Sequence, residues 1–475
     1  MRKIALIPVF LLTMAGAQAQ DHNPGSNHGN KFEQLDYLLP TPNEFRTASG
    51  APGGRYWQQR ADYDINVDIN EPENILTGAE TVTYYNNSPD ILTFLWLQLD
   101  QNIHSPMSGN NWDRPSKMTG SMTDLQLTQM DVMKHLDGYG ARIASLTDAA
   151  GKAIPYTINQ TMMRVDLPVA LKPGQKFVFK VNWSYKIPDK ATRPERGGYE
   201  FFPEDGNNLY SITQWFPRMA VYSDFQGWQH LQFSGGAEFA LTFGNYKVNI
   251  TVPSDHIVAA TGECQNLKSV LTAAQFNRWQ QAQTAKEPLE VVTLAEALEA
   301  SKTRKTDKKT WTFYAENVRD FAFNSSRRLV WDAMPVYIEG KKIMCMSFYG
   351  KEAYPIYKKY STKATAHTLK VYSKHTIPYP YPVAQSVEAN NGMEYPMIAM
   401  NYGRAEKDGT YSEATKYGAI GVIIHEVGHN FFPMIVNSDE RQWWWMDEGL
   451  NTFCRSEEHT SELQSLTNLV CRLLL

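Results

Sequence analysis

The chain has 475 residues, of which 42% are hydrophobic, 12% aromatic and 20% charged, and this apolar content excludes a wholly disordered chain. Lysine and arginine total 46 against 50 aspartate and glutamate, which gives a net charge of −4. Because there is no basic excess, we do not expect nucleic acid as a partner. Four scattered cysteines are too few for a disulfide scaffold or a cysteine zinc cluster, and the length allows roughly three domains.

The first 19 residues have the pattern of an export signal. Two basic residues precede a short apolar run at 4–15, and residues 17–19 read AQA, a signal-peptidase cleavage pattern. The apolar run is shorter than the roughly 20 residues that cross a bilayer, and no later stretch is suitable, so we expect no transmembrane segment. We therefore expect a signal peptide at 1–19, a flexible leader at 20–48, and a protein exported to the periplasm or the exterior of a Gram-negative-type bacterium.

Residues 49–325 carry the signals of a β-rich N-terminal domain. Apolar residues alternate strictly with polar ones from Tyr63 to Ile69, which is the period of a half-buried strand. The same alternation recurs at 177–181 and at 246–252, and turn residues separate the strand-like runs. The pattern predicts a large antiparallel β domain.

A helical insert is predicted near residues 266–302. Thr272 is followed three residues later by Gln275, and Thr293 by Glu296, which is the capping-box pattern at the start of a helix.

From residue 326 to residue 454 strand and helix signals mix. We expect strands at 334–338 and 343–349 and a helix at 354–373. The sequence therefore predicts an α+β multidomain fold in which a catalytic-type domain follows the β domain.

Residues 421–430 read GVIIHEVGHN and contain the H-E-x-x-H motif as His425, Glu426 and His429. On a helix, residues i and i+4 lie on one face, so both imidazoles can bind one zinc ion. Glu426 lies between them, where it can accept a proton from an attacking water. The alternative is an ordinary core helix on which both histidines make polar contacts.

A catalytic zinc needs a third protein ligand and an open coordination position. Ile435 stands where a third histidine would follow the motif in one known arrangement. A glutamate on a second helix is the other arrangement, and Glu448, in the segment WMDEG, follows His429 after eighteen residues (430–447). The spacing predicts one Zn²⁺ per chain, bound by His425, His429 and Glu448.

These motifs resemble the zinc signature of the aminopeptidase N and leukotriene hydrolase family of gluzincin metallopeptidases. Residues 391–396, NGMEYP, resemble the family's G-x-M-E-N motif, and Glu394 precedes His425 by 31 residues (425 − 394), as in that family. Segments 214–218 and 252–262 resemble its saddle-like N-terminal domain. The resemblance implies an antiparallel β saddle-like domain at 49–325 followed by a partial thermolysin-like catalytic domain at 326–454.

The resemblance also implies an activity, a zinc aminopeptidase that hydrolyses N-terminal residues from peptides with a free N-terminus. It implies roles for eight residues: zinc ligands His425, His429 and Glu448, general base Glu426, amine-binding Glu394, strand-like substrate contacts Gly392 and Met393, and a second amine contact, Gln214. The chain departs from the family motif at Tyr395, where the family has asparagine.

Two other functions stay open, a zinc endopeptidase and a non-catalytic peptide-binding member of the family. The sequence indicates neither the preferred residue, nor the oligomeric state, nor whether Cys264 pairs with Cys345. Residues 455–475 resemble the in-frame translation of a sequencing-library adapter, so we expect a non-native tail on a truncated protein. The family's catalytic tyrosine and helical C-terminal domain would follow beyond this point, so the activity of the fragment itself is open.

Overall fold

The computed structural model describes residues 42–106, 108, 121–124, 127, 131, 138–193 and 196–459. The signal peptide expected at 1–19, most of the leader expected at 20–48, and residues 460–475 of the expected tail lie outside the described residues. Within the described residues, no helix is long and apolar enough to cross a membrane.

The chain divides into two compact units, residues 1–57 and residues 58–475. The described part of the first unit consists of turns and one antiparallel bridge between Arg46 and Pro52.

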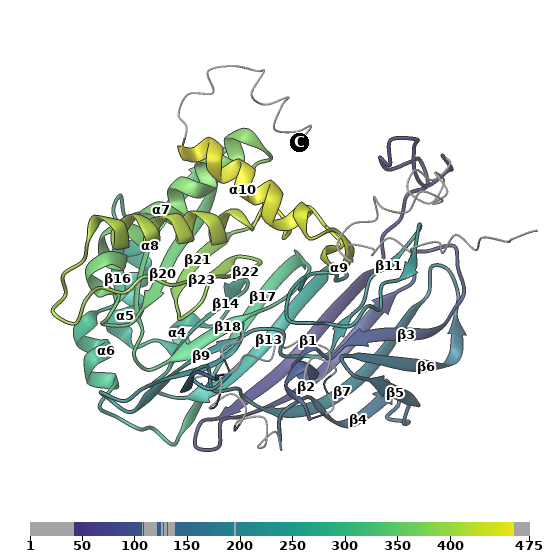
Figure 1. Cartoon of the computed structure of the whole chain (residues 1–475), viewed down its shortest axis with the longest axis horizontal. Helices are drawn as coiled ribbons and strands as arrows, with labels where there is room; N and C mark the ends of the chain where they lie inside the picture. The colour runs from purple at the N-terminus through teal and green to yellow at the C-terminus, as the bar shows by residue number, and fades with distance from the viewer. Residues whose placement is uncertain are drawn as a thin grey trace, which may run out of the picture. The chain divides into compact units, whose positions relative to one another are not determined.

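Three main sheets form the β-rich part of the second unit (Figure 1). The largest has the order β15-β17-β13-β1-β2-β7-β4, with bounds Glu263–Cys264, Lys308–Val318, Gly244–Pro253, Arg60–Asn70, Ile75–Tyr85, Lys176–Lys186 and Arg142–Asp148. The second has the order β10-β3-β6-β5, with bounds Arg218–Met219, Leu92–Gln98, Met162–Leu171 and Tyr156–Asn159. The third has the order β14-β18-β9-β8, with bounds Ile257–Ala260, Phe323–Ser326, Asn207–Ile212 and Gly198–Phe202. A short pair, β11 (Tyr222–Ser223) and β12 (Gly227–Trp228), and the 3-10 helix η2 (Asp100–His104) complete this part.

The alternating sequence patterns form strands as predicted. In β1 buried and more exposed residues alternate along the strand, and Tyr63, Ile65, Val67 and Ile69 all lie in the core. The pairing differs from the expectation of a purely antiparallel domain, because β1 and β13 run parallel. Parallel neighbours need a long connection, and here the chain forms β2 to β12 between them.

The predicted helical insert contains three helices, α4 (Leu267–Val270), α5 (Ala273–Ala282) and α6 (Leu294–Ala300). Both predicted capping boxes are confirmed, at the starts of α5 and α6. The insert also contains a strand that the sequence analysis did not predict, β16 (Leu289–Val292), which pairs with β19 (Val330–Ile338). Four residues are too few to show a strand period.

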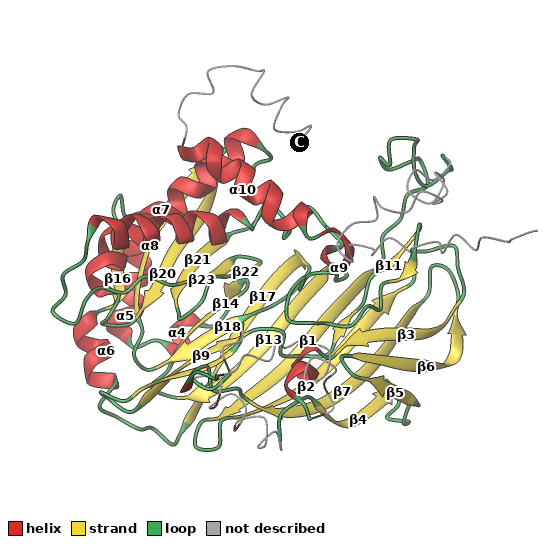
Figure 2. Ribbon diagram, viewed as in Figure 1, coloured by secondary structure: helices red, strands yellow, loops and turns green. Residues whose placement is uncertain are grey.

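The second half of the chain forms a six-stranded sheet of order β16-β19-β20-β21-β23-β22, and helices cover it (Figure 2). The remaining strands are β20 (Lys341–Tyr349), β21 (Val383–Glu388), β23 (Ile398–Asn401) and β22 (Met393–Tyr395). The helices are α7 (Tyr354–His375), α8 (Glu413–Gly428), α9 (Glu440–Trp443) and α10 (Trp445–His459). Helices α7 and α8 contact the sheet, and α10 contacts both of them. The predicted strands and the predicted helix in this half are confirmed, and the fold is α+β with an N-terminal β part.

Cys264 and Cys345 carry free thiols and do not pair with each other.

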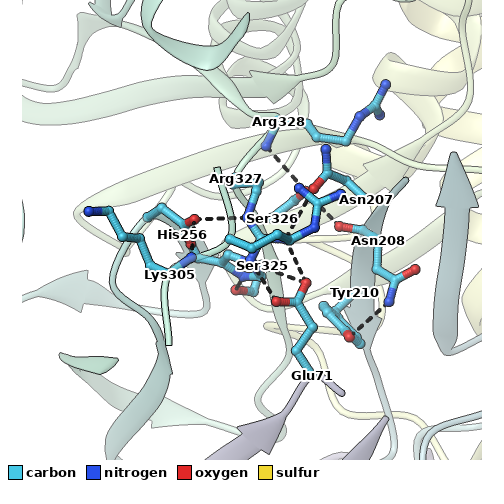
Figure 3. A network of polar contacts seen from close by, with 12 residues as sticks. Glu71, Asn207, Asn208, Tyr210, His256, Lys305, Ser325, Ser326, Arg327 and Arg328 are labelled. Atoms are coloured by element: carbon cyan, nitrogen blue, oxygen red, sulfur yellow. Dashed lines mark hydrogen bonds and ion pairs between the residues drawn. The ribbon is translucent and has the colours of Figure 1, made fainter. Parts of the chain in front are cut away.

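A buried arginine cross-links the β sheets (Figure 3). Arg327 donates to both carboxylate oxygens of Glu71, at 2.7 and 2.6 Å, and to Asn207 Oδ1 at 3.1 Å. Asp255 Oδ2 accepts a fourth hydrogen bond, from Arg327 Nε, at 3.0 Å. Because the charge is fully paired, this arginine can be buried where the turn after β1 meets β9 and the loop before β14.

Candidate metal centre

The H-E-x-x-H motif lies at the end of helix α8. Ser412 begins the helix as its N-cap and accepts a hydrogen bond from the Thr415 backbone N–H at 3.0 Å. His425 occupies the last turn and His429 the C-cap, so the four-residue spacing places both rings at the same end of the helix. Ile423 and Val427 are fully buried and fix the other face of α8 in the core.

Helix α10 brings the third predicted ligand to this end of α8, and the two helices are neighbours in Figure 1. Glu448 Oε2 lies 3.2 Å from His425 Nε2 and 3.7 Å from His429 Nε2, and the two Nε2 atoms are 3.2 Å apart. In a tetrahedral zinc site with bonds of about 2.0–2.2 Å, donor atoms lie roughly 3.3–3.5 Å apart. The three side chains therefore fit one zinc ion. The Glu448 side chain is 46% exposed, so the centre is open on one side.

The ring of His429 is oriented by its other nitrogen. Nδ1 lies 2.9 Å from the Phe432 carbonyl and 2.7 Å from Asp447 Oδ1, two acceptors that favour a proton on Nδ1. The lone pair then lies on Nε2, the atom that faces Glu448. This is the arrangement by which outer contacts orient a metal-binding imidazole.

A buried brace holds helices α7, α8 and α10 together beside the centre. Tyr372 OH donates to Asn451 Oδ1 at 2.9 Å, and Asn451 Nδ2 donates to the His425 carbonyl at 2.8 Å. Gly428 leaves room for this contact, because a Cβ there would lie 2.4 Å from Asn451 Oδ1 and 2.5 Å from Tyr372 OH. The brace fixes the distance between the helix that carries both histidines and the helix that carries Glu448.

Two buried carboxylates lie against the same centre. Ligand atoms of Glu394, Glu426 and His429 all lie within 4.8 Å of one another, and both glutamates are less than a tenth exposed. Glu394 comes from strand β22 and Glu426 from α8, so sheet and helix meet here. Gly392 makes the approach possible, since a Cβ at that position would lie 2.5 Å from Glu426 Oε1.

The site gathers several carboxyl groups whose negative charges repel one another, and this repulsion, together with burial, makes them hard to ionise. Burial raises the pKa of the Glu394 carboxyl to about 8, and the charges of Asp447 and Glu238 add to this effect. Burial, and then the charge of Glu394, raises the pKa of Glu426 well above its usual range. Repulsion of this kind is relieved by a bound cation, either a metal ion or an ammonium group.

The remaining predicted site residues surround strand β22, the edge strand of the six-stranded sheet. Met393 is fully buried and pairs with Met400 on β23. The Gln214 backbone N–H donates to Tyr395 OH at 2.9 Å, so the tyrosine that departs from the family motif joins β22 to the β-rich part. The side-chain Nε2 of Gln214 is buried and has no hydrogen-bond partner within the described part of the chain.

An arginine that the sequence analysis missed contacts the two residues just before strand β22. Arg196 Nη1 donates to the Gly392 carbonyl at 3.1 Å, and the Arg196 carbonyl accepts from Asn391 Nδ2 at 2.7 Å. Its Nε forms an ion pair with the buried Glu238 at 2.8 Å. Burial would lower the pKa of Arg196, but the charges of Glu238, Glu394 and other site carboxylates raise it.

The missed residues differ in how they could have been found. Asp447 precedes Glu448, and Asn451 follows it by three residues on one helix face, so helical periodicity could have indicated Asn451. Arg196 and Glu238 are far from the motifs in sequence, and no local pattern points to them.

No protein-family model matches the sequence, and a search of curated proteins finds no match. Among solved structures, the M1 zinc metallopeptidase from Deinococcus radiodurans is similar over 86% of this chain and 73% of its own, with a TM-score of 0.51 and 15% identity. A mutant of that enzyme bound to the substrate Tyr-Ser-Ala matches 85% of this chain and 72% of its own, with a TM-score of 0.50 and 15% identity. A two-domain M1 zinc metallopeptidase mutant bound to L-arginine gives a TM-score of 0.51 at 16% identity, over 85% of this chain and 72% of its own. The chain has the fold of the M1 zinc metallopeptidases. At this identity the likeness concerns the fold alone.

Proposed function

We propose that this protein is a zinc-dependent aminopeptidase that removes N-terminal residues from peptides. The observation that carries the proposal is the placement of a buried carboxylate, Glu394, within 4.8 Å of the imidazole of His429, one of three side chains that fit a zinc ion. A metal centre next to a buried anion can bind a peptide that begins at that point.

Glu426 is proposed as the general base. When bound, zinc supplies a Lewis acid that polarises the scissile carbonyl and activates water. Glu426 accepts the proton of the attacking water and delivers it to the leaving nitrogen. Its position beside Gly392 keeps the carboxylate close to the centre without making it one of the three ligands.

Glu394 is proposed to bind the α-ammonium group of the substrate. A carboxylate that is 5% exposed forms a strong charge-assisted hydrogen bond with an ammonium group, because little water competes. The buried, unpartnered Nε2 of Gln214 is a further polar group on this side of β22, and we propose it as a weaker contact of the substrate terminus.

The edge position of β22 supports the predicted roles of Gly392 and Met393. An edge strand offers unpaired backbone groups, to which an extended peptide can add as a further strand. The first residue of such a peptide would connect Glu394, at its amine, to the metal centre, at its carbonyl.

Ligands of the fold neighbours agree with a peptide substrate. One neighbour was crystallised with the substrate Tyr-Ser-Ala, and another with L-arginine. We extend the substrate class, peptides with a free N-terminus, to this chain as part of the proposal.

Three further predictions complete the proposal. The signal pattern at 1–19 predicts an exported protein, and residues 49–325 and 326–454 are proposed as the β-rich and catalytic domains. The proposal assigns one zinc ion to each chain.

The experiment compares a peptide with a free N-terminus and its N-acetylated form as substrates of the zinc-loaded protein. We expect Glu426→Gln to keep zinc and to lose about 10² to 10⁴ in rate. We expect Glu394→Ala to reduce cleavage of the free-amine peptide only. Equal cleavage of both peptides would favour a zinc endopeptidase, and binding without cleavage would favour a peptide-binding protein; either result overturns the proposal.

A further inference from the structure

Among the described arginines whose charges act on the site carboxylates, Arg196 is the accessible one. Its side chain is 37% exposed. Three other arginines that act on the site carboxylates are almost fully buried, with exposures of 5% or less: Arg218, Arg319 and Arg441. Arg319, for example, donates to the carbonyls of Pro433, Phe239 and Ser438 inside the protein.

The Arg196 guanidinium is held in a fixed position. Glu238 binds Nε, the Gly392 carbonyl binds Nη1, and Asn391 binds the Arg196 carbonyl. No described residue is an acceptor for Nη2. A fixed guanidinium loses little side-chain entropy when it binds a ligand, and its planar geometry suits a carboxylate.

Burial along β22 gives the direction in which a bound peptide must leave the site. At one end Tyr395 is fully buried against Gln214 and Phe239, which closes that side. At the other end Gly392 is partly exposed and Asn390 is exposed. A peptide whose amine lies at Glu394 therefore extends past Gly392, which is where Arg196 lies.

We propose that Arg196 binds the substrate on the leaving-group side of the scissile bond, where its guanidinium donates hydrogen bonds to the C-terminal carboxylate of a dipeptide. This inference rests on the proposed function, because it takes the peptide orientation from Glu394. It narrows the substrate class to short peptides with a free carboxylate in the second position.

The test measures binding, so that it does not depend on turnover. The zinc-loaded Glu426→Gln protein is titrated at low salt with Leu-Ala and with Leu-Ala amide. Both titrations are repeated with the double variant that carries Glu426→Gln and Arg196→Gln. We expect the free acid to bind more tightly than the amide, and the second substitution to weaken the free acid about tenfold. Amide binding should change less than threefold.

Arg164→Gln is the matched control. Arg164 is also a partly exposed arginine, at 45%, and it pairs with Asp166 on the same strand, away from the site. Arg164→Gln should change neither affinity. Zinc content is measured in every variant, since a purely structural role of Arg196 would lower zinc content or weaken both ligands alike.

The outcomes separate the two proposals. Equal weakening of acid and amide by Arg196→Gln, or no weakening of either, overturns the role of Arg196 and leaves the aminopeptidase proposal intact. Hydrolysis is measured separately, on the zinc-loaded protein with Glu426 intact. If Leu-Ala binds through Arg196 but this protein hydrolyses no peptide, the proposed function is refuted and the carboxylate contact is supported. Failure to bind either peptide overturns both.

Discussion

Replacing Gly428 by alanine should weaken both the fold and the metal centre. The new Cβ would lie 2.4 Å from Asn451 Oδ1 and 2.5 Å from Tyr372 OH, about 1 Å inside normal contact. Asn451 and Tyr372 are both buried, so neither side chain can rotate into solvent. Helix α10 would therefore have to move away from α8.

The expected cost follows from the contacts of this brace. Overpacking in a dense core costs about 1–3 kcal/mol, and two disturbed hydrogen bonds cost about 1 kcal/mol each. Alanine is better than glycine within a helix by up to about 1 kcal/mol. We expect a net loss of about 2–4 kcal/mol in the free energy of unfolding, measured on the metal-free protein by denaturant titration of tryptophan fluorescence.

The same displacement should reduce zinc affinity, because Glu448 lies one turn before Asn451 on α10. We expect a fall of about ten- to a hundredfold in a competition assay with a chromophoric chelator. Glu448→Gln, which alters a proposed ligand directly, sets the scale for this loss.

Gly421→Ala is the matched control, because it lies on the same helix and a Cβ there meets nothing within 4 Å. The free energy of unfolding of this variant should be equal to that of the parent protein or higher by up to about 1 kcal/mol, and its zinc affinity should be unchanged. If Gly428→Ala equals Gly421→Ala in both measurements, the brace does not position the ligands and the reasoning is wrong.

Two further predictions concern a close approach and a buried acid. Gly392→Ala should push Glu426 from its position, since the new Cβ would lie 2.5 Å from its Oε1, and should lower peptide hydrolysis by about 10² with zinc retained; activity within threefold of the parent would contradict this. Burial raises the pKa of Glu80 well above 4.5, and neither carboxyl oxygen has a partner in the described structure. A carboxyl whose pKa is higher in the folded than in the unfolded state stabilises the folded protein at low pH. Its contribution to the free energy of unfolding is complete below about pH 4.5 and is lost as pH rises toward the folded-state pKa. Glu80→Met should therefore raise Tm more at pH 7.5 than at pH 4; an equal shift at both values would show that Glu80 does not titrate on unfolding.

The sequence by itself determined the local structure and the residue types of the site. The alternation from Tyr63 to Ile69, and the two capping boxes, depend on neighbours within a few residues, and each formed the predicted element. The four-residue spacing of His425 and His429 likewise fixes their common helix face. Such features are readable because strand and helix periods are set by the backbone.

Pairings over long sequence distances were decided by the tertiary structure. The parallel contact of β1 with β13, and the addition of β16 to the six-stranded sheet, depend on which apolar faces pack together, and no local pattern encodes that choice. The predicted set of zinc-binding residues was available from the motif and its spacing. Their donor distances, which depend on the packing of α8 against α10, were not.

The surroundings of the centre were decided in the same way. Arg196 meets Gly392 only after the loop before β8 packs against the edge of the six-stranded sheet. Asn451 and Tyr372 meet because α7, α8 and α10 close around a glycine. A buried polar contact of this kind needs several segments in place at once, because each partner is satisfied only by the others.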